Sequence, residues 1–91
     1  MRITFVKKIL EDGSPCGKCA DVDKRLHDSG QMAHIDHVAI ADEREFNSEG
    51  MKLARQHSVK HAPFFIVEDD ADNVQIYTVY FKFVKEVLNT L

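Results

Sequence analysis

The chain of 91 residues has no tryptophan, two prolines, four glycines and only two cysteines. Two cysteines are too few for the disulfide scaffold of a small secreted protein. Lysine and arginine number 12 against 15 aspartates and glutamates, and this acidic balance argues against a nucleic-acid interface, which normally needs a basic stripe. No apolar run approaches the ~18 residues of a membrane span. We therefore expect neither nucleic acid nor a membrane as a partner.

The composition is that of an ordinary globular protein, with 44% hydrophobic and 30% charged residues. A chain of this length forms one hydrophobic core, so residues 1–91 are predicted to be a single domain, which we expect to be monomeric. Residues 1–8 place their charges after the apolar stretch and have no small-residue cleavage site. They are typical of a strand and not of a signal peptide, so we expect a cytoplasmic protein.

The hydrophobic pattern predicts seven elements in the order β-α-β-α-β-β-α. We expect strands over residues 2–10, 34–41, 64–67 and 74–79. We expect helices over residues 14–29, 47–57 and 81–91. Ser14 is the predicted N-cap of the first helix, with Pro15 at its first position. Gly50 lies inside the second helix, where glycine is unfavourable.

This order predicts an α/β fold with a four-stranded mixed sheet. The first two strands are joined by a helical crossover and should be parallel, whereas the last two are joined by a short turn and should be antiparallel. Helices should cover both faces of the sheet. Ligand sites in such folds lie beyond the carboxyl ends of the strands. The segment that contains Cys16 follows the first strand and falls in this position.

The motif Cys16-Gly17-Lys18-Cys19 is the strongest indication of function. In a reducing compartment, two cysteines at this spacing indicate redox chemistry or half of a metal site. A thiolate at a helix N-terminus is stabilised by unpaired N–H groups and by the helix dipole. The dipole contributes only about 0.3–1 kcal/mol. Because lowering a pKa by two units needs about 2.7 kcal/mol, hydrogen bonds to the sulfur or the charge of Lys18 should add to it.

The chemistry expected of this motif is thiol–disulfide exchange. Cys16 is the predicted nucleophile, which forms a mixed disulfide with the substrate. Cys19 lies one turn further along the apolar face of the helix and is the predicted resolving cysteine. Its attack releases the reduced product and leaves a Cys16–Cys19 disulfide, and no other cofactor is expected.

The layout of strand, C-G-K-C, helix and a proline ahead of an apolar strand resembles the thioredoxin-like proteins. Residues 57–66, HSVKHAPFFI, are similar to the thioredoxin segment that contains a cis-proline, and residues 84–88 are similar to its last helix. A chain that starts directly at the first core strand is more like a glutaredoxin. The resemblance implies a thioredoxin-like fold and a cis Ala62–Pro63 bond that faces the cysteines. It also implies that the backbone of Ala62 pairs with substrate, and that the partners are protein disulfides and a reductase.

The chain departs from these families at several positions. The tryptophan that precedes the thioredoxin motif is Pro15 here, and the acid that assists the resolving cysteine falls at Leu10. The glutaredoxin lysine before the motif is Gly13, and residues 78–82, TVYFK, replace the paired glycines and acid that hold glutathione. These departures argue against specific use of glutathione. They also leave open a second interpretation, a binding module that has kept the fold and lost efficient catalysis.

A zinc site is the third interpretation. The spacing Cys16-x2-Cys19-x14-His34-x2-His37 is close to a zinc-finger pattern. Two residues between the histidines are fewer than the usual three to five or so. In addition, strand residues three apart point to opposite faces of a sheet. We therefore expect no metal.

Overall fold

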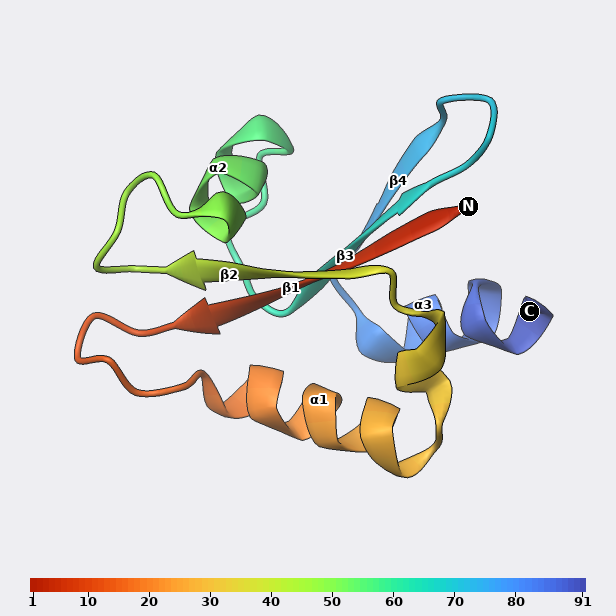
Figure 1. The fold of residues 1–91 in the computed structure, drawn as a ribbon, viewed down its shortest axis with the longest axis horizontal. Coiled ribbons are helices and arrows are strands. Elements are labelled where there is room, and N and C mark those ends of the chain that lie inside the picture. The colour runs from red at the N-terminus through yellow and green to blue at the C-terminus, as the bar shows by residue number, and fades with distance from the viewer.

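The computed structural model describes residues 1–91 and contains one four-stranded sheet, three α-helices and two short 3₁₀ helices (Figure 1). In chain order the elements are β1 (Arg2–Ile9), α1 (Gly17–Asp28), η1 (Gln31–His34), β2 (His37–Asp42), α2 (Glu49–Gln56), β3 (Phe64–Glu68), β4 (Val74–Tyr77), α3 (Tyr80–Glu86) and η2 (Leu88–Thr90). The strand order across the sheet is β2-β1-β3-β4. Strand β2 is parallel to β1, β3 is antiparallel to β1, and β4 is antiparallel to β3. The predicted α/β fold with a mixed four-stranded sheet is confirmed.

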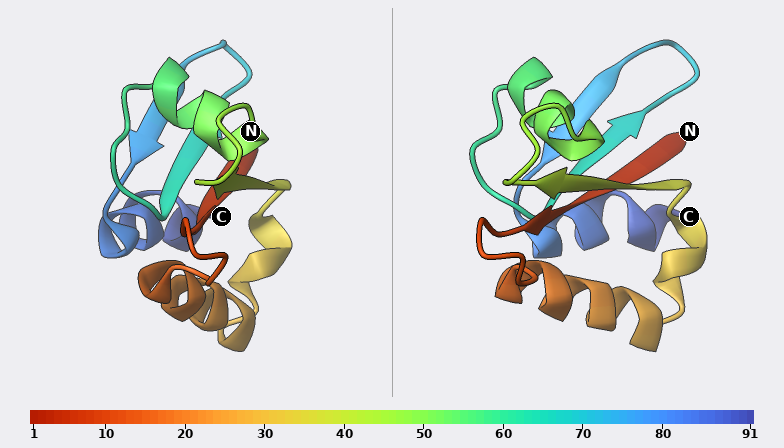
Figure 2. Two further views of the ribbon diagram at one scale, coloured as in Figure 1. Left: turned by 90° about the vertical axis from the view of Figure 1, so that its left-hand side faces the viewer. Right: turned by 60° about the vertical axis from the view of Figure 1, so that its left-hand side comes forward.

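The sheet separates two layers of helices, with α1 and α3 on one face and α2 on the other (Figures 1 and 2). The alternation of side chains along β1 supplies both cores. Ile3 and Phe5 belong to the larger core under α1 and α3, and Val6 belongs to the smaller core under α2. None of the helices combines the length and the apolar character needed to span a membrane.

A stack of three phenylalanines forms the centre of the larger core. The ring of Phe65 on β3 lies between Phe5 on β1 and Phe83 on α3, with ring centroids 4.9 Å and 3.9 Å apart. All three side chains are essentially inaccessible to solvent. Stacked rings contribute attraction beyond the area that they bury, so this column ties the last helix to the two central strands.

The first helix begins later than the sequence predicted. Cys16, and not Ser14, is its N-cap, and the helix starts at Gly17. The reason is that Pro15 forms a β-bridge with Ile9, so the chain is still extended at this point. Proline at the first helical position is common but not obligatory.

Two other predicted boundaries were wrong. Residues 34–36 were expected in the second strand, but a 3₁₀ turn ends at His34 and β2 starts at His37. The last helix was expected to continue to residue 91, but α3 ends at Glu86 and a separate 3₁₀ turn follows. The interruption falls at Val87, whose φ of -118° and ψ of -65° depart from helical geometry.

Gly50 allows α2 to pack closely against β2. A Cβ atom at this position would lie 2.6 Å from the Cα of Ala41 and closer still to the Ala41 nitrogen and the Ile40 carbonyl carbon. These atoms belong to the backbone of the sheet and cannot move aside as a flexible side chain could. The glycine that is unfavourable for the helix is therefore required by packing.

Gly50→Ala should lower the free energy of unfolding by about 1–3 kcal/mol, the usual cost of overpacking. Gly17→Ala is the matched control, because a Cβ there would meet no other atom within 4 Å. Urea denaturation of the two variants and the parent chain measures the difference. Equal stability of both variants would contradict the close approach of α2 to β2.

Candidate dithiol site

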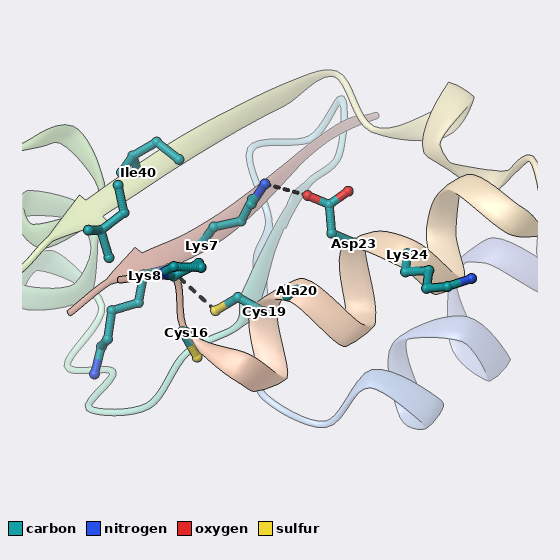
Figure 3. Close-up of a pocket in the computed structure, with 10 residues that line it drawn as sticks. Lys7, Lys8, Cys16, Cys19, Ala20, Asp23, Lys24 and Ile40 are labelled. Atoms are coloured by element: carbon teal, nitrogen blue, oxygen red, sulfur yellow. Dashed lines mark hydrogen bonds and ion pairs between the residues drawn. The ribbon is translucent and has the colours of Figure 1, made fainter. Parts of the chain in front are cut away.

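The backbone of Lys8 positions both cysteines. Its carbonyl oxygen accepts a hydrogen bond from the Cys16 N–H at 3.2 Å, and its N–H donates to the Cys19 Sγ at 3.3 Å. Figure 3 shows the second of these bonds between the end of β1 and the first turn of α1. One residue of the central strand thus fixes the place of both sulfur-bearing residues.

The N–H and C=O groups of Lys8 are not used by the sheet, because β1 extends beyond the end of the neighbouring strand β3. Alternate residues of a strand direct their N–H and C=O groups to alternate sides. Lys8 therefore points to the same side as Val6, which is paired with Phe64 at the start of β3. Beyond Val6 there is no β3 residue left to pair, and the segment that leads into α1 takes its place.

The two thiols have different environments. Cys19 is buried, with 2% of its surface exposed, whereas Cys16 is only partly buried. Both cysteines are free thiols in this structure. A partly exposed thiol can meet a substrate, and the buried one is restricted to partners that reach it from within the site.

The pKa values of the two thiols differ as well, and the partly exposed thiol has the lower one. Burial acts to raise the pKa of Cys16. This effect is outweighed by hydrogen bonds from the N–H and the thiol of Cys19, by a hydrogen bond from the Lys18 N–H and by the charge of Lys8. The net effect is a lowered pKa. Burial raises the pKa of Cys19 to about 11, and the Lys8 N–H opposes this only in part. The pair thus consists of a thiol that ionises readily and one that holds its proton.

The contribution of Lys18 differs from the one that the sequence suggested. Lys18 affects Cys16 through its backbone N–H, whereas the ammonium group that lowers the pKa of Cys16 is that of Lys8. The side chain of Lys8 also lies 3.9 Å from Glu43. Sequence reasoning did not single out Lys8. Its position two residues before the expected carboxyl end of the first strand was the available signal.

A cavity of about 440 Å³ adjoins the two cysteines (Figure 3). Its apolar wall comes from Pro15, Ile9 and Ile40, and an ion pair between Lys7 and Asp23 forms part of its far side. Such a space beside a partly exposed thiol can receive the group that carries a substrate disulfide.

Of the two predicted substrate-binding residues, Pro63 lies beside the cysteine motif and Ala62 lines a neighbouring cavity. The Ala62–Pro63 peptide bond is cis. Pro63 lines a surface depression together with Gly17 and Lys18, so it adjoins the cysteine motif directly. Ala62 lines a different cavity, which faces α2 and is described below.

The four residues of the zinc pattern are not brought together. His37 stands opposite Thr4 on β1, four residues before Lys8, which corresponds to about 13 Å along a strand. Its Nε2 atom lies 2.8 Å from Glu49. No group of three or more histidine, cysteine, aspartate or glutamate side chains in residues 1–91 is arranged to hold a metal ion. The spacing in the sequence therefore does not correspond to a site in the fold.

Comparisons of the chain with protein-family models, curated proteins and solved structures found no match. The residues of the site provide a partly exposed thiol of lowered pKa at a helix N-terminus, and a buried thiol of raised pKa one turn away.

Lys8→Gln should raise the pKa of Cys16 by less than about one unit, as expected for the loss of one partly screened charge. Lys18→Gln should change it less, because the backbone N–H of residue 18 remains. The ultraviolet absorbance of the thiolate, followed against pH in a Cys19→Ser background, measures both values. A larger effect of Lys18→Gln would contradict the assignment of the charge to Lys8.

Proposed function

We propose that this protein is a thiol–disulfide oxidoreductase of thioredoxin-like fold. The observation that carries the proposal is the asymmetry of the two sulfurs. Cys16 is accessible and has a lowered pKa, and Cys19 is buried and has a pKa raised to about 11. An exchange site needs one thiolate that attacks a substrate and one thiol that stays protonated until the mixed disulfide forms.

The arrangement of the fold supports the same proposal. The cysteine motif lies at the carboxyl end of the central strand β1 and at the start of α1, and Pro63 lies beside it. This is the layout that the resemblance to thioredoxin-like proteins implies. The strand order β2-β1-β3-β4, with helices on both faces, is compatible with it.

The reaction proceeds in two exchanges. The Cys16 thiolate attacks one sulfur of a substrate disulfide, forms a mixed disulfide with it and releases the other sulfur as a thiolate, which takes a proton from solvent. Cys19 then loses its proton to solvent and attacks the Cys16 sulfur. The Cys16–Cys19 disulfide forms, and the remaining substrate sulfur leaves as a thiolate. Two electrons pass from the dithiol to the substrate.

The surrounding residues have supporting roles in this reaction. The Lys8 N–H stabilises the Cys19 thiolate as it forms, because it already donates to that sulfur. Pro63 shapes the surface next to the motif, and the backbone of Ala62 pairs with the substrate chain. The substrates are protein disulfides, and a separate reductase or thiol returns the disulfide to the dithiol.

A binding module with weak catalysis is the second candidate. The observation that favours it is the surroundings of Cys19, whose sulfur accepts one hydrogen bond from outside the motif, from the Lys8 N–H, and whose thiol donates to no carboxylate. Nothing next to the sulfur is then ready to take its proton. The two candidates differ in the rate of the second exchange.

Cys16→Ser should abolish the reduction of insulin by dithiothreitol-reduced protein, because the attacking thiolate is lost. Cys19→Ser should retain the first exchange and accumulate the mixed disulfide, which mass spectrometry detects as an adduct on Cys16. Circular dichroism of both variants shows whether the fold is intact.

Full activity of Cys16→Ser would overturn the proposed roles. Alkylation of Cys16 at the rate of an ordinary peptide thiol, together with no insulin reduction by the parent chain, would favour the binding module.

A further inference from the structure

A second cavity shares Lys8 with the cavity beside the cysteines. Its volume is about 430 Å³, and it is formed between α2 and the segment that leads into β3. This segment passes beside α2 in both views of Figure 2. Lys8 lines both cavities, so the second one adjoins the candidate dithiol site. Nothing in the exchange chemistry uses it.

The cavity combines an apolar floor with a basic rim. Met51, Val59 and Phe64 contribute to the floor. The cations on the rim are Lys8, Arg55 and Lys60, and His61 lies beside them. The one acidic residue in the lining is Glu43, and it lies near Lys8.

Two of these cations have no acidic partner. Neither Arg55 nor Lys60 forms an ion pair with any side chain of the protein. Arg55 is nevertheless held in place, because its guanidinium donates to the Phe46 carbonyl at 2.6 Å and lies 3.8 Å over the Phe46 ring. A fixed guanidinium loses little freedom when it meets an anion.

This local excess of positive charge contrasts with the chain as a whole, whose net charge is -3. Cations without partners around an apolar floor form a surface complementary to a chain that carries carboxylates among apolar side chains. Because Ala62 lies in the lining, a substrate chain paired with its backbone would pass directly over this surface.

We propose that the cavity between α2 and the Ala62 segment binds an acidic stretch of the protein substrate, next to the disulfide that Cys16 attacks. This inference rests on the proposed function and adds the class of substrate. Lys60 and Arg55 contact the carboxylates, and the apolar floor accepts a neighbouring side chain. Acidic residues on that side of the disulfide raise the rate of the first exchange by holding the substrate in place.

Two peptides with the same disulfide test the proposal. One carries aspartate and glutamate beside one of its cysteines, and the other carries asparagine and glutamine at the same positions. The parent chain should reduce the acidic peptide about fivefold or more faster, in kcat/KM, at low ionic strength. The preference should shrink as salt is added, because partly exposed charges are screened.

Lys60→Glu should remove this preference and leave kcat/KM for the neutral peptide within about twofold of the parent value. Lys52→Glu is the matched control. It makes the same change of charge at an exposed lysine of α2 that does not line the cavity, and it should keep the preference. If Lys60→Glu does not fold, Lys60→Gln should give a smaller loss of the same kind.

Equal rates for the two peptides with the parent chain would overturn the inference. Equal losses in Lys60→Glu and Lys52→Glu would also overturn it, because the preference would then follow net charge and not this cavity. In both cases, reduction of the neutral peptide that depends on Cys16 would leave the proposed function in place. Failure to reduce either peptide would count against the proposed function itself.

Discussion

The site depends on the two hydrogen bonds between the backbone of Lys8 and the two cysteines. They exist because β1 is longer than β3, so that the last pair between these strands is Val6 with Phe64. The exposed edge of the central strand is satisfied by the cysteine segment. The register of the sheet therefore determines where the thiols lie.

The same geometry explains the difference between the two thiols. Cys16 is the N-cap residue of α1 and remains partly exposed, and the backbone N–H groups of Lys18 and Cys19 lower the pKa of its thiol. Cys19 faces the sheet and is buried against the end of β1. Burial raises the pKa of Cys19, whereas at Cys16 the hydrogen bonds within the motif and the charge of Lys8 outweigh the effect of burial.

The sequence was sufficient for the order of the elements, for the mixed sheet and for the position of the cysteine motif, because these follow from hydrophobic periodicity and turn chemistry. It was insufficient where tertiary contacts decide the outcome. The helix start at Gly17 depends on a bridge between Pro15 and Ile9, and the role of Lys8 depends on which side of β1 lacks a neighbour. Local patterns carry no information about either. Gly50 is a similar case, because the requirement for glycine at this position comes from its close contact with the backbone of β2.

The antiparallel register of β1 and β3 has one further consequence. Continued by two residues, it would place Ala62 opposite Lys8, in competition with the cysteine segment for the same N–H and C=O groups. The chain turns away at Pro63, and the competition is decided in favour of the cysteines. The residue at which β3 starts is therefore as much a part of the site as the motif itself. Two segments of the chain could pair with this edge of β1, and the cysteine segment occupies it because β3 starts only at Phe64.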